Sequence, residues 1–324
     1  GTAPGWTANR ANCMWRKRGA GEVMFNKIFI LGAGAIGSVL GGLLSEKNDV
    51  TLVGNKAHVD AVNSSGLSIS GDVTGSFHVH ADTKIRQVPE ETLIFLTTKA
   101  YDSEKAIKEV RRLLRKDTVI LVLQNGLGNE EVVEHAVGYG PKVLRGITTM
   151  AAEFFKPGEV KYWRGETTIA NDPPADKVAQ TLNVSMLKTS LSRDIKHEIW
   201  IKVVVNSVVN PLTAIFRVRN HEIGTHPLAS VRHNIVRECI QVGKAEGIAF
   251  PRGLEQRIER EILRYTNFSS MCQDILKRKK TEIDFLNGRI VELGREHRVP
   301  TPLNETLASF VKFLEESNEL PRKD

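Results

Sequence analysis

The stretch Lys27-Ile28-Phe29-Ile30-Leu31-Gly32-Ala33-Gly34-Ala35-Ile36-Gly37 decides the fold expected for this chain. Its first five residues form the apolar run of a buried β-strand, and the G-x-G-x-x-G pattern opens an apolar helix through Leu44. In this context the first glycine permits a tight turn, the second lets backbone N–H groups approach a pyrophosphate, and the third lets helix pack on strand. The alternative is a plain glycine turn. The second strand that follows favours dinucleotide binding by Gly32, Ala33, Gly34, Ala35, Ile36 and Gly37.

That second strand, from Asp49 to Val53, ends in Gly54-Asn55-Lys56. About 20 residues beyond the glycine motif, a fold that prefers NAD usually offers Asp or Glu to the ribose hydroxyls. This sequence has no carboxylate there, and Lys56 is placed to meet a 2′-phosphate. We therefore expect NADPH to be favoured, with NADH as the other candidate. In the alternative, Lys56 is only the solvated start of a helix that runs toward Val62.

Two further strands, Thr92 to Thr97 and Thr118 to Leu123, are continuous apolar runs that each end in polar residues. Ligands bind at the carboxyl ends of the strands in open α/β sheets. Lys99 follows the first strand and is a candidate for contact with an anionic cofactor or substrate. Asn125 follows the second, where a nicotinamide ring or its substrate would lie. The alternative for Lys99 is a surface lysine before the helix expected from Ser103 to Leu114.

The pattern of strands and helices divides the chain into two domains. Strand and helix alternate from Lys27 to about Ser192, and helical patterns dominate from Asp194 onward. A small hairpin from Leu67 to His80 interrupts the alternation, and its histidines are expected to be exposed strand residues, so no metal site is predicted. The predicted fold class is α/β, with an N-terminal Rossmann-type domain followed by an all-α domain. The expected parts are an extension at 1–23, the dinucleotide-binding domain at 24–192, the helical domain at 193–318 and a tail at 319–324.

The run from Ile199 to Pro211 sets three polar side chains in an otherwise apolar stretch. At about 100° per residue in a helix, Lys202, Asn206 and Asn210 share one stripe. The valine content favours a strand, but the apolar run lasts from about residue 195 to 212, which is a normal helix length. Asp194 is the expected N-cap. Pro211 is expected to kink or end the helix.

A second polar stretch runs from Asn267-Phe268-Ser269-Ser270-Met271 through Gln273 and Asp274 to Thr281-Glu282-Ile283-Asp284. Ser269 or Ser270 is expected to cap a helix, and capping alone explains both serines. Glu282 begins an apolar helical stripe, where it either serves a site or only favours the helix dipole. The basic run 277–280 is read as a solvated turn, because no aromatic side chains accompany it.

Composition agrees with a two-domain globular protein of 324 residues, in which 41% of residues are hydrophobic and 26% charged. The formal charge is +7, of which the first 23 residues carry +3, and the remaining +4 suits small anions at least as well as nucleic acid. The three cysteines lack metal or disulfide spacing. The apolar runs are read as shorter than the roughly 20 residues of a membrane span. Neither nucleic acid nor membrane is therefore an expected partner, and the cytoplasm is the expected compartment.

Five stretches in this order make the chain resemble the ketopantoate reductases, the 2-dehydropantoate 2-reductase family of the pantothenate pathway. They are the glycine loop, Thr98-Lys99-Ala100, Gln124-Asn125-Gly126, Lys202 with Asn206 and Asn210-Pro211, and Ser269-Ser270-Met271 through Glu282-Ile283-Asp284. The resemblance covers about Lys27 to Phe313. The glycine loop is shared by many dehydrogenases, whereas the lysine-asparagine helix combined with the serine-glutamate segment is specific to this family and its close relatives.

The resemblance implies the activity and the site residues. It implies reduction of the C2 ketone of 2-dehydropantoate with NADPH or NADH, by a homodimer with its active site between a Rossmann and a helical domain. Lys202 resembles the catalytic lysine and Glu282 the partner of the substrate hydroxyl. The residues that resemble substrate or cofactor contacts are Asn125, Asn206, Asn210, Asn220, Asn267 and Ser270. Many members carry Arg where Asn55 stands, so Asn55 and Lys56 are the cofactor contacts expected at this position, with Lys56 substituting for the arginine.

Two other interpretations remain open at this stage. A related 2-keto acid reductase would use the same lysine on another small-molecule substrate. A non-catalytic dinucleotide-sensing protein would keep Gly32, Gly34 and Gly37, but it would have no need of a proton donor such as Lys202. A nucleic-acid binder has only the basic composition and the tetrapeptide at 277–280 in its favour.

Overall fold

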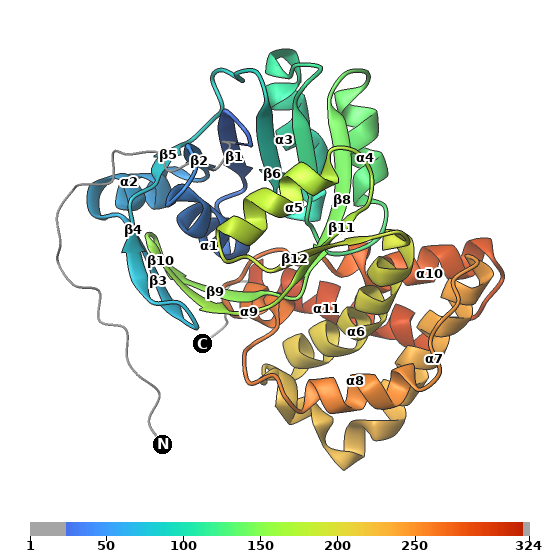
Figure 1. Cartoon of the computed structure of the whole chain (residues 1–324). Helices are drawn as coiled ribbons and strands as arrows, with labels where there is room; N and C mark the ends of the chain where they lie inside the picture. Colours follow the sequence, from blue (N-terminus) through green and yellow to red (C-terminus); the bar gives the residue numbers. More distant parts are fainter. Residues whose placement is uncertain (1–23, 320–324) are drawn as a thin grey trace, which may run out of the picture.

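The computed structural model describes residues 24–319, which form an α/β part and a helical part side by side (Figure 1). The expected extension at 1–23 and residues 320–324 lie outside the described residues. The last strand of the α/β part ends at Ser192, and the first helix of the helical part begins at Ile195. The fold class expected from the sequence is confirmed.

The α/β part is built on an eight-stranded sheet with the order β12-β11-β8-β7-β6-β1-β2-β5. All neighbours are parallel except β8 and β11. The strand order reverses between β1 and β6, which is where a doubly wound sheet binds its ligand. The bounds are β1 Lys27–Leu31, β2 Val50–Val53, β5 His80–Asp82, β6 Thr92–Leu96, β7 Val119–Val122, β8 Lys142–Thr148, β11 Thr167–Ala170 and β12 Thr189–Ser192.

The strands are continuously apolar because both faces of the sheet are buried. In β1, Ile28 and Ile30 pack with α1, α2 and α5, whereas Phe29 and Leu31 pack with α3 and α4 on the opposite face. Side chains alternate between the two faces of a strand, so one apolar run supplies two cores. The helices are α1 Ala35–Ser45, α2 Lys56–Ser65, α3 Ser103–Val110, α4 Asn129–Val137 and α5 Ala175–Val184, with short 3-10 helices η1 Ala100–Asp102 and η2 Arg111–Leu113 around α3.

A second sheet lies against the far side of α1, with the order β4-β3-β10-β9. Its strands are β3 Leu67–Gly71, β4 Gly75–Phe77, β9 Ala151–Lys156 and β10 Glu159–Trp163. The predicted hairpin is present as β3 and β4. β3 also pairs in parallel with β10, which the sequence did not predict. Gly42 of α1 allows this packing, since a Cβ there would lie 2.7 Å from Ile69 Cδ1.

The helical part is organised around the long helix α6, Ile195–Phe216. Its neighbours are α7 Ala229–Ala245, α8 Leu254–Ile262, α9 Ser270–Leu276, α10 Asn287–Glu296 and α11 Pro302–Glu319, with 3-10 helices η3 Asn220–Gly224, η4 His226–Leu228 and η5 Ile283–Phe285. Asp194 caps α6 as expected, because its side chain accepts a hydrogen bond from the His197 N–H at 3.0 Å. Among the helices within 24–319, α6 alone is long and apolar enough to cross a membrane, contrary to the shorter runs read from the sequence. Most of it is buried as the core of the helical part.

Pro211 does not end α6, which continues to Phe216. A proline has no N–H, so the carbonyl of Ser207 one turn earlier loses its helical partner. Asn287 replaces that partner, because its Nδ2 donates to Ser207 O at 2.9 Å. Asn287 comes from α10, 80 residues away, so local sequence rules could not include it. The helix therefore remains continuous through its polar stripe.

Candidate active site

The glycine loop between β1 and α1 has the geometry of a phosphate cradle. Gly32 has φ +116°, and a Cβ there would lie 2.3 Å from the Thr98 nitrogen. A Cβ on Gly37 would lie 2.1 Å from Gly32 O, so this glycine lets the helix pack on the turn. Gly34 is exposed, and no atom lies within 4 Å of its Cβ position. The N-terminus of α1 has no side-chain cap and no acidic residue in its first turn, so its free N–H groups suit a pyrophosphate.

The other motif residues of this turn are also in place. Ala33 is buried, and Ala35 and Ile36 are half-buried at the start of α1. Thr97, at the end of β6, donates from Oγ1 to Gly32 O at 2.8 Å. Because β6 is the neighbour of β1, the segment that carries Lys99 lies next to the glycine loop. The loop and this segment therefore border the switch point from both sides.

At the end of β2, the two predicted cofactor contacts, Asn55 and Lys56, each already have an interaction within the protein. Asn55 caps α2, since its Oδ1 accepts a hydrogen bond from the His58 N–H at 3.0 Å. Lys56 is exposed and its Nζ lies 2.6 Å from an Asp60 carboxylate oxygen. An exposed pair of this kind is weak and easily rearranged. Lys56 therefore remains available to an anion.

Lys202 extends from α6 toward the sheet, where its Nζ donates to the carbonyl of Thr148 at the end of β8. The distance between Nζ and the Thr148 oxygen is 2.6 Å. The pKa of Lys202 is lowered to about 7, mainly by burial and also by the charge of Arg145, while Glu282 acts in the opposite direction. A lysine in this state shares its proton readily near neutral pH, which suits a general acid.

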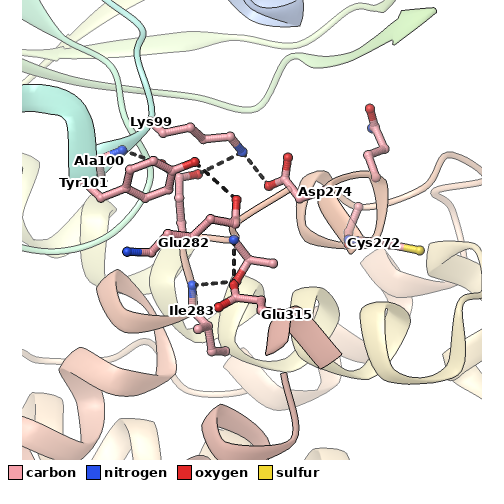
Figure 2. Close-up of polar contacts among 12 residues, drawn as sticks. Lys99, Ala100, Tyr101, Cys272, Asp274, Glu282, Ile283 and Glu315 are labelled. Atoms are coloured by element: carbon pink, nitrogen blue, oxygen red, sulfur yellow. Dashed lines mark hydrogen bonds and ion pairs between the residues drawn. The ribbon is translucent and has the colours of Figure 1, made fainter. Parts of the chain in front are cut away.

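Glu282 joins the two parts of the molecule. Its Oε1 accepts a hydrogen bond from the Ala100 N–H at 2.8 Å, and its Oε2 lies 3.6 Å from Lys99 Nζ. Asp274 of α9 lies 2.5 Å from the same Lys99 Nζ. Figure 2 shows Lys99 reaching to both carboxylates. The interpretation of Lys99 as a solvated surface lysine is therefore wrong.

The charged side chains of Lys99, Asp274 and Glu282 influence one another's pKa values. Burial alone would lower the pKa of Lys99, but Glu282 and Asp274 raise it well above its ordinary value. Burial raises the pKa of Asp274, and Lys99 opposes that effect. Glu282 does not start an α-helix, because it precedes the one-turn 3-10 helix η5 and α10 begins only at Asn287. Its side chain serves the interdomain contact and not a helix dipole.

The asparagines of α6 follow Lys202 along the helix. Asn206 is half-buried and Asn210 is 5% exposed. Within residues 24–319 neither side-chain amide has a hydrogen-bond partner. Buried amides normally have one, so these two are free to bind a polar ligand.

The two serines at the start of α9 have separate roles. Ser269 is the N-cap, accepting from the Cys272 N–H at 3.0 Å, and its Oγ lies 2.7 Å from Thr213 Oγ1. Ser270 is exposed and is not needed for capping. Capping therefore accounts for one serine and leaves Ser270 as the candidate for ligand contact.

Asn220 and Asn267 are brought together by the backbone, because the Asn220 N–H donates to Asn267 O at 3.0 Å. Both residues are buried. The Oδ1 of Asn220 is buried without a partner in the described part of the chain. The amide of Asn267 donates to Phe268 O at 2.9 Å. Asn220 thus keeps its side-chain oxygen as an acceptor for a ligand, whereas the Asn267 side-chain nitrogen already donates one hydrogen bond.

Asn125 lies in a loop that touches the helical part. Gly126 has φ +98°, and a Cβ there would lie 2.5 Å from the carbonyl oxygen of Phe285, three residues beyond Glu282. Only glycine fits both conditions. Asn125 is half-buried, and among the described residues its one hydrogen bond is made by its backbone carbonyl, which accepts from Asn129 Nδ2 at 2.8 Å. The loop therefore carries a free amide beside the segment of Glu282.

The sequence interpretation missed Arg145, Thr148 and the role of Asp274. Arg145 is a charged side chain in the middle of the predicted strand Val143–Ile147, and its side chain is 4% exposed. A charged residue in a strand expected to be buried could have identified Arg145 as a residue with a specific role, because buried charges are rare. Asp274 lies one helical turn after Ser270, which was a weaker signal. Thr148 contributes only its carbonyl, which no sequence pattern shows.

A doubly wound sheet with an open glycine loop at its switch point, facing a helical part that supplies a lysine of lowered pKa, defines a two-domain dinucleotide-binding protein. Residues 28–173 match the family described as ketopantoate reductase PanE/ApbA, and residues 194–315 match its C-terminal counterpart. The chain therefore belongs to the ketopantoate reductase family.

Individual relatives agree with that assignment. A 2-dehydropantoate 2-reductase of Pyrococcus horikoshii is 38% identical over 299 residues, which cover 89% of this chain and 97% of the relative. A PanE/ApbA family ketopantoate reductase of Ralstonia eutropha has a TM-score of 0.84 at 27% identity, with 91% of this chain and all of the other covered. A D-mandelate dehydrogenase in complex with NADH and anilino(oxo)acetate has a TM-score of 0.83 at 30% identity, with the same coverage.

Proposed function

We propose that the protein reduces the C2 ketone of 2-dehydropantoate to pantoate with a reduced nicotinamide dinucleotide. The observation that carries the proposal is Lys202, a lysine with a pKa of about 7 held next to the strand ends of a dinucleotide-binding sheet. Negative charge develops on the ketone oxygen as a hydride arrives at carbon. A general acid at that oxygen contributes about 10²–10⁴-fold to such a reaction.

In this proposal the bound dinucleotide supplies the hydride, and the glycine loop holds its pyrophosphate. Lys202 gives a proton from Nζ to the ketone oxygen. The Thr148 carbonyl orients Nζ, and it favours the charged ammonium as a hydrogen-bond acceptor. The charge of Glu282 helps keep Lys202 protonated until the substrate is in place.

The other site residues bind and orient the substrate. Glu282 accepts a hydrogen bond from a substrate hydroxyl through lone pairs not used by Ala100. Amide and hydroxyl groups of the helical part bind the carboxylate and hydroxyl, and these groups are Asn206, Asn210, Asn220, Asn267 and Ser270. Fixed orientation of this kind makes the transfer effectively unimolecular.

We infer further that NADPH is the preferred cofactor and that Lys56 binds its 2′-phosphate. The support is that the end of β2 carries no carboxylate and that, within residues 24–319, Lys56 is held by a single exposed ion pair with Asp60. In Lys56→Ala, the KM for NADPH is expected to rise about twofold to fivefold, as for loss of an exposed charge contact worth up to about 1 kcal/mol. The KM for NADH should stay unchanged. Lys105→Ala, an exposed lysine on α3, is the control.

A second substrate class is supported by the likeness to the D-mandelate dehydrogenase, whose complex holds a bulky 2-oxo acid. The test is a steady-state assay that crosses 2-dehydropantoate and a panel of linear, branched and aromatic 2-keto acids with NADPH and NADH. The highest kcat/KM is expected for 2-dehydropantoate. A bulky or hydroxyl-free acid that turns over faster would assign the protein to the other class, and failure of every acid would leave a sensing role.

We also propose that the protein is a cytoplasmic homodimer. Cys239 and Cys272 are free and buried, as is usual in a reducing compartment. Phe310 and Phe313 lie three residues apart on α11 and are 54% and 66% exposed, which suits an interface. Light scattering should give the mass of two chains. It should give one chain for Phe313→Glu if this face is the interface.

A further inference from the structure

Arg145 of β8 is a fully enclosed guanidinium that spans the ends of two strands. It donates to the carbonyls of Val122 and Gln124 at 2.9 Å each and to that of Gly126 at 3.1 Å. A fourth hydrogen bond goes to the carbonyl of Gly146. Two of these acceptors, Gln124 and Gly126, belong to the turn that follows β7, and Val122 is the last residue of β7 itself. The planar guanidinium with its five donors suits this task, which a lysine could not perform.

The turn held by Arg145 carries Asn125 and contacts the segment of Glu282. Gly126 packs against the carbonyl of Phe285, and the Leu127 N–H donates a hydrogen bond to the same carbonyl at 3.4 Å. A shift of this turn would therefore move Asn125 and disturb the chain next to Glu282. Arg145 thus fixes the position of one part of the site relative to the other.

The charge of Arg145 is only partly compensated. Its Nε lies 3.1 Å from Oε2 of Glu130 in α4, in an ion pair that is not aligned as a hydrogen bond. Burial raises the pKa of Glu130, which weakens it as a counter-ion. β8 also supplies the Thr148 carbonyl that holds Lys202, so the guanidinium and the ammonium lie along one strand. Arg145 lowers the pKa of Lys202, in addition to the larger effect of burial.

We propose that Arg145 is a positioning residue for the reduction, which shapes the turn that presents Asn125 and adds a positive charge, moderated by Glu130, to the strand whose Thr148 carbonyl holds the proton donor Lys202. The proposal rests on the reductase function proposed above. The other charge that acts on Lys202 is Glu282, which is itself engaged by Lys99 next to Asp274.

Different variants of the full-length protein test the two parts of this role, the shaping of the turn and the positive charge. Arg145→Lys keeps a positive charge but cannot reach all four carbonyls. It should raise the KM for the 2-keto acid about tenfold while the alkaline limb of the kcat profile stays within about 0.3 pH units. Arg145→Met combined with Glu130→Gln removes the charge pair without leaving a buried carboxylate unpaired. Its alkaline limb should move to higher pH by about half a unit or more, because Lys202 then holds its proton more tightly.

Glu130→Gln alone provides the opposite test, because it removes the counter-ion and leaves the guanidinium. Its alkaline limb should move to lower pH. Arg232→Met is the matched control, since Arg232 is also buried, pairs with Glu259 at 2.6 Å and holds the carbonyls of Ile223 and Thr225 in the helical part. It should lower the thermal stability and leave the alkaline limb in place.

The outcomes decide between the possibilities. Opposite shifts in the double variant and in Glu130→Gln support the proposal. An unmoved limb in both variants, with unfolding midpoints that show folded protein, would overturn it and leave Arg145 as a purely structural residue. Wild-type protein without activity on any 2-keto acid would instead reject the proposed function, so the two failures are distinguishable.

Discussion

Lys99, which follows β6, and Lys202 in α6 are both half-buried, yet the protein shifts their pKa values in opposite directions. Lys99 has two carboxylates within 3.6 Å, and they hold it charged. Lys202 has only a carbonyl at 2.6 Å as hydrogen-bond acceptor among the described residues, and burial together with the like charge of Arg145 lowers its pKa to about 7. Burial pushes both in the same direction, and the neighbours decide the outcome.

This difference separates two uses of a buried ammonium. Lys99 with Asp274 and Glu282 joins the α/β part to the helical part and does not give up its proton near neutral pH. Lys202 gains nothing from an ion pair and is therefore able to exchange its proton. Glu282 belongs to both regions, because it contacts Lys99 and also raises the pKa of Lys202.

The largest effect is expected when Lys202 is replaced by a residue that cannot donate a proton to the substrate. In Lys202→Ala, kcat should fall about 10²–10⁴-fold. The kcat of Lys202→Arg should fall by nearly as much, because a guanidinium supplies the charge but does not release a proton. Steady-state kinetics with 2-dehydropantoate measures both variants.

Lys196→Ala is the matched control for these variants, since Lys196 is an exposed lysine of the same helix. Its kcat should equal that of the wild type. Near-normal turnover of a folded Lys202→Ala would remove the distinction between the two lysines and with it the proton-donor role.

Glu282→Gln removes the residue that the two regions share. The KM for 2-dehydropantoate should rise roughly 10- to 100-fold, because a hydrogen bond to a charged group contributes about 1.5–3 kcal/mol. The pKa of Lys202 should fall further, since Glu282 raises it, so the alkaline limb of kcat should move to lower pH. Activity will therefore decline more at about pH 8 than at about pH 6.

Glu315→Gln controls for disturbance of the same segment, because Glu315 accepts from the Thr281 N–H at 2.6 Å. It should leave the alkaline limb where it is. If Glu282→Gln shows wild-type KM and an unmoved limb, Glu282 has only the interdomain contact as its role.

The sequence predicted the features that depend on local rules. The glycine loop, the cap at Asp194 and the stripe of Lys202 follow from spacings of a few residues, so the elements that carry them were found. The pairing of Lys99 with Asp274 spans 175 residues, and that of β3 with β10 about 90. Such contacts arise from the packing of separate elements, and no periodicity encodes them. Of the two expectations for Pro211, a kink or an end of the helix, the end is wrong for the same reason, since the Asn287 that satisfies the freed carbonyl comes from another helix.

Asp274→Asn weakens the Lys99 side of the comparison and should leave the Lys202 side intact. The ammonium keeps Glu282 but loses its closer partner, so the free energy of unfolding should fall by about 2 kcal/mol, discounted because Lys99 is 31% exposed. Urea unfolding measures it. Asp284→Asn is the control, because its pair with Lys312 is exposed on both sides and should contribute less than about 0.5 kcal/mol. Equal losses would mean that the Lys99 cluster is no stronger than a surface pair.

The smallest effect concerns the cost of keeping Lys202 buried. Its folded-state pKa of about 7 lies below its ordinary value of 10.5, so the folded protein resists protonation of this lysine more than the unfolded chain does. Below about pH 7 the lysine is charged in both states, and the penalty is complete. Between about pH 7 and 10.5 the unfolded chain binds more protons, so the stability of the wild type rises with pH.

Lys202→Met removes this penalty and should be more stable than the wild type by about 1 kcal/mol at pH 6, with the difference shrinking as pH rises toward 9. Thermal unfolding across this range measures it. Lys99→Met should behave in the opposite way and lose stability, because its removal leaves Asp274 and Glu282 buried without their cation. If both variants lose stability at every pH, then Lys202 is held by its surroundings as firmly as Lys99, and the lowered pKa that the proposed mechanism uses does not exist.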